Sequence, residues 1–172
     1  MAFIVESGTG LENSNSFVTT DWATDYFADR GNEVWGNVIT TAKEAALVLA
    51  TDYINMNYIF TGFKLLQTQA LQWPRLDAYD INDDELLLIP VVLKKATVEL
   101  ALLALSDATL IPNLDNNGKI KKERIEGAVE VEYTDAGYSE VRTFSYVDKL
   151  LLNFGIAKGK QGSSGQIKVI RT

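Results

Sequence analysis

The sequence predicts a mainly α-helical fold, in which a bundle of about four helices carries a small antiparallel β-hairpin and an extended C-terminal tail. Three observations lead to this prediction. Apolar residues recur at helical spacing in several segments, two β-prone runs flank a short turn, and the end of the chain combines glycine, serine and basic residues. The chain has 172 residues, which is enough for one ordinary domain.

Two helices are predicted in the first third of the chain. The first covers about residues 21–30, and Thr20 is placed to cap it. The second covers about residues 42–58, where Thr41 and Glu44 have the spacing of a capping box. Both segments have apolar residues on one side, so each is expected to pack that side against the core.

Two more helices are predicted later in the chain. The segment from about 91 to 106 follows Pro90 and is apolar on nearly every side, which is typical of the central helix of a bundle. A short fourth helix is predicted at 146–153, because Val147 and Leu151 there share one face.

The β structure is expected to be small. A β-hairpin is predicted at about 119–133. Its two strands would cover 119–125 and 129–133, and its turn 126–128. Residues 3–5 favour a further short strand. Glycine and asparagine surround the hairpin segment, as is typical of turns.

Composition divides the chain at residue 155. Residues 1–155 form the predicted helical domain with its hairpin, and they hold 12 basic and 23 acidic residues. Residues 156–172 form a predicted flexible basic tail, which contains four basic residues and no acidic one. The whole chain has a net charge of -7. The sequence therefore predicts an acidic body with a basic tail.

Residue types that are absent exclude several kinds of chemistry. The chain contains no histidine and no cysteine, which excludes Ser-His-Asp and Cys-His triads, the common zinc sites and disulfides. No other catalytic residues stand out, so we expect no enzymatic activity, no metal and no cofactor. The longest mostly apolar stretch, 89–105, contains three charged residues, and no signal peptide precedes it, so we expect a soluble intracellular protein without a membrane partner.

Three polar patterns have both a functional and a structural interpretation. The acidic residues between 77 and 85 could bind a divalent cation, but their spacing is not that of a calcium loop and favours a solvated loop. The Gly8–Gly10 segment lacks the lysine of a phosphate loop. Glu130 and Glu132 could act as paired carboxylates, although alternating glutamates are typical of the exposed face of a hairpin.

Two groups of basic residues are candidates for binding. A possible DNA-facing group lies in the hairpin and consists of Lys119, Lys121, Lys122 and Arg124. Strand geometry divides these four cations between two faces, which weakens the interpretation. The second group belongs to the tail, where short apolar residues alternate with cations. Its candidate docking residues are Lys158, Lys160, Ile167, Lys168, Val169, Ile170 and Arg171. A disordered end is the alternative.

Several segments, in their order and spacing, resemble one family. The segments are Asn15–Val18, Tyr26–Asn32 with Trp35, Ala50–Ile54, Thr68–Arg75, Ile89–Pro90 before Lys94–Thr97, Lys121–Tyr133 and Val147–Leu151. Together they resemble tailed-phage proteins labelled putative DnaT-like single-stranded-DNA-binding, whose members are similar in size and helical layout to head-to-tail adaptor, or connector, proteins.

The resemblance implies a structural virion protein and no catalytic residue. It implies a ring beneath the portal, commonly of about twelve copies, at the head–tail junction of a virion assembled in the host cytoplasm. Its partners would be the portal, a stopper or tail-completion protein, other copies of itself and passing double-stranded DNA bound without sequence specificity. The loop from Thr68 to Glu85, with Trp73, Pro74 and Arg75, is a candidate inter-subunit or tail-side contact. The alternative is a replication accessory protein that binds single-stranded DNA.

Overall fold

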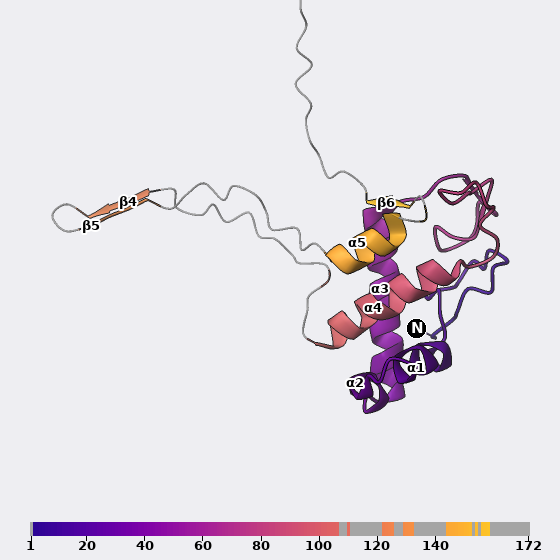
Figure 1. Ribbon diagram of the computed structural model, residues 1–172, viewed down its shortest axis with the longest axis horizontal. Helices are drawn as coiled ribbons and strands as arrows, with labels where there is room; N and C mark the ends of the chain where they lie inside the picture. The colour runs from indigo at the N-terminus through magenta and orange to yellow at the C-terminus, as the bar shows by residue number, and fades with distance from the viewer. Residues whose placement is uncertain are drawn as a thin grey trace, which may run out of the picture. The chain divides into compact units, whose positions relative to one another are not determined.

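Helices dominate the structure, as the sequence predicts (Figure 1). The computed structural model describes residues 2–106, 110, 122–125, 129–132, 144–152, 154 and 156–158. The helices in these residues are α1 (Thr20–Ala28), α2 (Glu33–Gly36), α3 (Thr40–Asn57), α4 (Val91–Leu105) and α5 (Ser145–Leu152). All but α2 lie on segments that the sequence predicts to be helical, so the mainly α fold class is confirmed.

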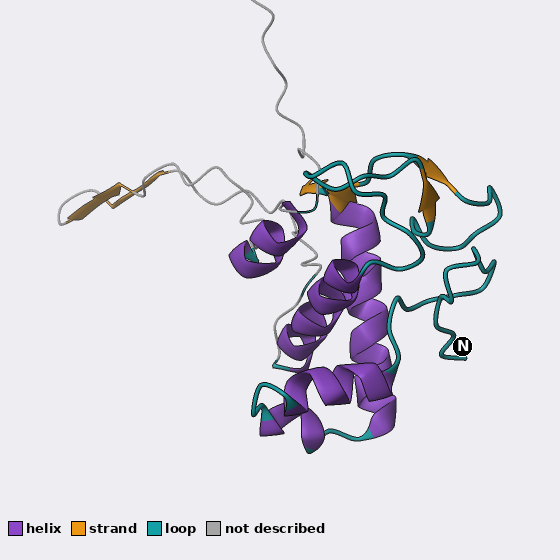
Figure 2. Ribbon diagram, turned by 45° about the vertical axis from the view of Figure 1, so that its right-hand side comes forward, coloured by secondary structure: helices purple, strands orange, loops and turns teal. Residues whose placement is uncertain are grey.

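The long helix α3 and the apolar helix α4 pack against each other and form the centre of the helical unit (Figure 2). Each buries residues at positions i, i+3 and i+7, which are Leu47, Ala50 and Ile54 on α3 and Leu93, Ala96 and Leu100 on α4. Burial of each leucine or isoleucine contributes about 1.5–3 kcal/mol of transfer free energy. Helix α4 also packs against α5, which agrees with the central position predicted for it.

The N-termini of the first two helices are capped by side chains. The cap of α1 is Thr19 rather than the predicted Thr20, because the Thr19 hydroxyl accepts a 3.1 Å hydrogen bond from the Trp22 amide. The single-turn helix α2 begins where the Asn32 side chain accepts a 3.0 Å bond from the Val34 amide. Both contacts satisfy amides that have no partner inside the helix.

The predicted capping box of the second long helix is wrong. Helix α3 already begins at Thr40, so Thr41 and Glu44 both lie inside it. Its N-cap is Ile39, which has no side-chain oxygen to accept an amide hydrogen bond.

In the part of the chain that the structure describes, strands are short and form three separate antiparallel pairs. The pairs are β1 (Tyr58–Ile59) with β6 (Ala157–Lys158), β2 (Phe63–Lys64) with β3 (Arg75–Leu76), and β4 (Lys122–Ile125) with β5 (Val129–Glu132). The last pair confirms the predicted hairpin. The strand predicted at residues 3–5 is reduced to one isolated bridge between Val5 and Ser16.

By spatial contacts the chain divides into two compact units. One consists of Met1–Leu110 with Phe144–Thr172 and holds all five helices, and the other is Ile111–Thr143, which contains the hairpin. Within the described residues, no helix combines the length and the apolar character needed to cross a bilayer.

The start of the predicted tail is part of the helical unit. The Ile156 side chain is buried, and the Ile156 amide donates a 3.1 Å hydrogen bond to the Leu151 carbonyl at the end of α5. Residues 157–158 then pair with β1. The rest of the tail, 159–172, lies outside the described residues.

Candidate interaction surface

The segment between α3 and α4, residues 58–90, contains little regular structure but many internal hydrogen bonds. Arg75 is one centre of these bonds. Its Nε donates to the Thr61 carbonyl at 2.5 Å, and its two terminal nitrogens donate to the carbonyls of Gly62 at 2.7 Å and Gln72 at 3.1 Å. Partial burial lowers the pKa of this guanidinium. Because three of its nitrogens donate hydrogen bonds to backbone carbonyls, Arg75 stabilises the conformation of this segment.

Gln69 is a second centre in the same segment. Its side-chain oxygen accepts from the Leu66 amide at 2.9 Å, and its side-chain nitrogen donates to the carbonyls of Leu71 at 2.8 Å and Pro74 at 3.0 Å. The Gln69 side chain is buried, and three partners satisfy it.

Trp73 anchors the segment to the core. Its indole is fully buried, packs edge-on against Phe60 with ring centroids 6.0 Å apart, and donates its N–H to the Leu88 carbonyl. The bond between Trp73 and Pro74 is cis, and Pro74 is buried as well. Of the predicted inter-subunit residues, Trp73 and Pro74 therefore hold the loop from inside, and a partner would contact their exposed neighbours.

Gly62 is required for the close approach of the two sides of this segment. Its φ is +69°, and a Cβ at this position would lie 2.1 Å from the Leu76 carbonyl oxygen and 2.8 Å from the Asp77 backbone. Any other residue would collide with backbone atoms, which cannot rotate away as a side chain can.

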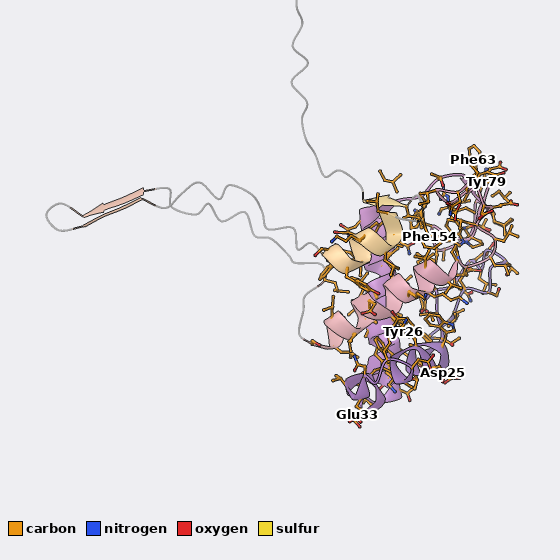
Figure 3. All side chains as sticks on the ribbon, viewed as in Figure 1. Asp25, Tyr26, Glu33, Phe63, Tyr79 and Phe154 are labelled. Carbon is orange, nitrogen blue, oxygen red and sulfur yellow. The ribbon has the colours of Figure 1, made fainter. Side chains whose placement is uncertain are left out.

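The segment presents apolar side chains to solvent. Phe63 and Leu76 stand directly opposite each other in the β2–β3 ribbon and are 71% and 48% exposed. Tyr79, which is 46% exposed, follows three residues later. Figure 3 places Phe63 and Tyr79 at the loop end of the helical unit, away from Glu33 of α2. Further exposed apolar residues of the segment and its flanks are Ile59, Leu66, Ile81, Leu87, Leu88 and Val91.

Carboxylates lie next to these apolar residues along the chain or opposite them in a bridge. Asp77 follows Leu76 directly, Asp80 follows Tyr79, and Glu85 stands opposite Tyr79 in an isolated antiparallel bridge. We call the apolar residues Phe63, Leu76 and Tyr79, together with the acidic residues Asp77, Asp80 and Glu85, the loop surface.

The acidic turn within 80–85 is locally ordered. Asp80 accepts hydrogen bonds from the amides of Asp84 at 3.0 Å and Asn82 at 2.7 Å, which hold the pKa of its carboxyl below the usual value. These contacts cap a turn. Among the described residues, no group of three or more acidic side chains is arranged to hold a metal ion.

The glycine-rich N-terminal loop already contains an anion. The buried carboxylate of Glu6 accepts hydrogen bonds from four consecutive amides, those of residues 8–11, and from the Ser14 hydroxyl, at 2.9–3.1 Å. The amides that would otherwise cradle a phosphate are thus occupied by the protein's own side chain. The glutamate two residues before Gly8 was the sequence signal for this arrangement.

The two groups of basic candidates are only partly within the described residues. In the hairpin, Lys122 stands opposite Glu132 and Arg124 opposite Glu130, so each basic position of this ribbon is matched with an acidic one. Lys119 and Lys121 lie outside the described residues, as do Lys160, Ile167, Lys168, Val169, Ile170 and Arg171 of the tail. Lys158 lies in β6, opposite Tyr58.

Most of the aromatic side chains that the structure describes belong to the core or pack against it. Tyr26, Phe27 and Tyr53 are buried, and Trp22 is partly buried. Trp22 stacks on Tyr26 with ring centroids 5.5 Å apart, and Arg30 lies 3.5 Å from the centre of the Tyr26 ring. The Tyr26 hydroxyl donates to Glu99 at 2.7 Å, and its burial raises its pKa.

Comparison with known proteins gives one match. The model of the family described as "Putative DnaT-like ssDNA binding protein" matches residues 1–172. No curated protein and no solved structure matches the chain.

Proposed function

The chain belongs to the family described as putative DnaT-like ssDNA binding proteins, and from this premise we propose that it is a structural adaptor of a tailed bacteriophage. In this proposal copies of the chain form a ring beneath the portal, join the portal to a stopper or tail-completion protein, and let double-stranded DNA pass. The protein acts in the virion at the head–tail junction, without a catalytic residue or a cofactor.

The exposed apolar side chains of the loop surface carry this proposal. Phe63 and Leu76 lie side by side on a segment that Arg75, Gln69 and Trp73 fasten from within. Burying apolar area against a partner is favourable by about 25 cal/mol per Å². An ordered surface also loses little conformational entropy on binding, so the loop surface suits a protein–protein contact.

The distribution of charge supports a conduit for DNA more than a DNA clamp. Residues 2–106 contain 14 acidic and 6 basic residues. Both arginines among these six cations are engaged in contacts within the chain: Arg75 in its three backbone bonds, and Arg30 over the Tyr26 ring with a 2.9 Å bond to the Tyr26 carbonyl. Such a surface offers little electrostatic attraction to the phosphates of DNA.

Single-stranded-DNA binding is the second candidate, because the family description names it. The stacked pair Trp22–Tyr26 with Arg30 is the feature that fits it best, since bases stack on aromatic rings. Tyr26 is buried, however, and its ring is already covered by Trp22 and Arg30. Asp21 and Asp25 on the same helix and Asp29 at its C-cap would repel a phosphate backbone.

A titration separates the two candidates. A fluorescently labelled single-stranded oligonucleotide is titrated with the full chain at low and at physiological salt. The adaptor proposal predicts no saturable binding at physiological salt. Tight binding with a steep dependence on salt would favour the second candidate and contradict the adaptor.

An assembly assay tests the adaptor role directly. Portal-bearing heads that lack this protein are incubated with the full chain or with a chain that ends at Lys158. The full chain is expected to join the heads and to permit tail attachment. The shortened chain is expected to fold but to join poorly, and unimpaired joining would contradict a docking role for residues 159–172.

A further inference from the structure

We propose that the loop surface of one copy binds the C-terminal segment 159–172 of a second copy, so that neighbouring subunits are linked head to tail. This inference rests on the proposed adaptor function and identifies the occupant of its main contact surface. A head-to-tail contact is of the kind that closes into a ring when the rotation between subunits permits.

Charge complementarity is the first argument. The loop surface combines three exposed apolar residues, Phe63, Leu76 and Tyr79, with three carboxylates that lie next to them along the chain or opposite them in a bridge. The segment 159–172 has the complementary composition: three basic residues, no acidic one, and Ile167, Val169 and Ile170 interleaved with the last two cations. In the proposed contact, apolar side chains pack against apolar side chains and cations pair with carboxylates.

The direction of the chain at β6 is the second argument. Ala157 pairs with Ile59 and Lys158 pairs with Tyr58, so β6 runs antiparallel to β1. At Lys158 the strand β6 is therefore directed toward the end of α3 and away from Ile59 and the loop that follows it. This direction favours the loop surface of another copy over that of the same copy.

The length of the segment is the third argument. Fourteen residues follow Lys158, and an extended chain of this length spans about 46 Å at ~3.3 Å per residue. That reach is greater than the length of α3, about 27 Å for 18 residues at 1.5 Å each. The apolar end of the segment can thus reach a neighbouring subunit.

The test is a complementation experiment on full chains by sedimentation velocity. A loop variant carries Phe63→Ser and Leu76→Ser, and a tail variant carries Ile167→Asp and Val169→Asp. A control variant carries Val34→Ser and Ile39→Ser, which are equally exposed apolar positions near α2. Circular dichroism establishes that every variant is folded.

The proposal predicts that the unmodified chain and the control self-associate. The loop variant alone and the tail variant alone are expected to self-associate with an affinity at least about tenfold lower. A mixture of loop and tail variants forms a species of two chains, because one intact tail meets one intact loop surface. Added salt weakens this association.

Three results would overturn the proposal: an unmodified chain that stays monomeric, a loop or tail variant that associates normally, or a mixture that stays monomeric. Failure of the adaptor role is recognised separately, in the portal assay. If both variants still form rings on portals, the adaptor role stands and the occupant proposed here is wrong. If complementation occurs but no chain joins portals, the proposed occupant stands and the adaptor role is wrong.

Discussion

Lys158 stands opposite Tyr58 in the β1–β6 ribbon, and this register fixes the point from which the C-terminal segment 159–172 continues. Tyr58 is held in turn by α5, because its hydroxyl donates a 2.5 Å hydrogen bond to the Asp148 carboxylate. The β1–β6 ribbon is thus connected to α3 through the chain and to α5 through this hydrogen bond.

Truncation at two nearby positions should give different results. A chain that ends at Lys158 keeps Ile156 and β6, and we expect its stability to remain within about 0.5 kcal/mol of the full chain. A chain that ends at Gly155 loses the buried Ile156 side chain, and we expect a loss of about 2–4 kcal/mol. Urea denaturation measures both. Equal stabilities would contradict the assignment of residues 156–158 to the helical unit.

Gly62→Ala should destabilise the protein more than Gly31→Ala. Both glycines have a positive φ, +69° and +64°, but a Cβ at Gly31 would meet no atom within 4 Å. The strain of φ alone costs about 1–2 kcal/mol, and the backbone collision at Gly62 adds to it. The readouts are thermal unfolding and hydrogen exchange of residues 60–77. A Gly62→Ala protein as stable as Gly31→Ala would show that the two sides of the loop are not in contact.

Glu6→Gln should weaken the N-terminal loop. The carboxylate accepts five hydrogen bonds, and an amide nitrogen in place of one oxygen would face donors. We expect a loss of about 2–4 kcal/mol in the free energy of unfolding, since charged acceptors make the stronger bonds. Glu12→Gln, at an exposed position, is the matched control and should change stability little. Similar changes in the free energy of unfolding for both substitutions would show that the Glu6 carboxylate does not stabilise the loop through these hydrogen bonds.

Tyr53→Phe should be neutral or stabilising near pH 7. The Tyr53 hydroxyl is buried and finds no hydrogen-bond partner among the residues that the structure describes. Removing an unsatisfied polar atom without changing shape is expected to raise stability by about 0–2 kcal/mol. Tyr79→Phe, at an exposed position, is the control. A loss of more than about 1 kcal/mol on Tyr53→Phe would indicate a hydrogen bond that holds this hydroxyl.

The raised pKa of Tyr53 predicts that the stability of the protein depends on pH in the alkaline range. Burial, with a smaller effect of the Asp148 charge, raises the pKa of Tyr53 to about 12. An unfolded tyrosine releases its proton near pH 10, so between about pH 10 and 12 the unfolded state binds fewer protons than the folded state. Stability therefore falls as pH rises through this window, and Tyr53→Phe should make the fall less steep. Denaturation midpoints measured from pH 8 to 12 test the difference.

The helices could be predicted from sequence because their signal is local. The apolar pattern of 91–106 and the stripe of 42–58 depend on neighbours three and four residues away, and α4 and α3 lie where these patterns indicate. The starts were less predictable, because Thr19, Thr20, Thr40 and Thr41 all have the chemistry of a cap. Single-turn helix α2 was missed, since four residues hold no periodic pattern, although Asn32 before Glu33 is a cap signal.

The sequence indicated the loop 68–85 as a contact, but it could not indicate which side chains of that loop are exposed. Several of the bonds that order the loop join residues 13 to 15 positions apart, such as Arg75 to Gly62 and Trp73 to Leu88. No periodicity reports contacts of that range. The sequence predicted the loop with Trp73, Pro74 and Arg75 as an inter-subunit contact. In the structure Trp73 and Pro74 are buried, and the exposed apolar residues are Phe63, Leu76 and Tyr79.

Imaging of the head–tail junction by electron cryo-microscopy tests the central claim most directly, in virions whose genome encodes this chain. The adaptor account predicts a closed ring of this protein beneath the portal, with Phe63 and Leu76 of each subunit covered by the C-terminal segment of a neighbour. Absence of the chain from the junction, or a ring in which these two side chains face solvent, would contradict it.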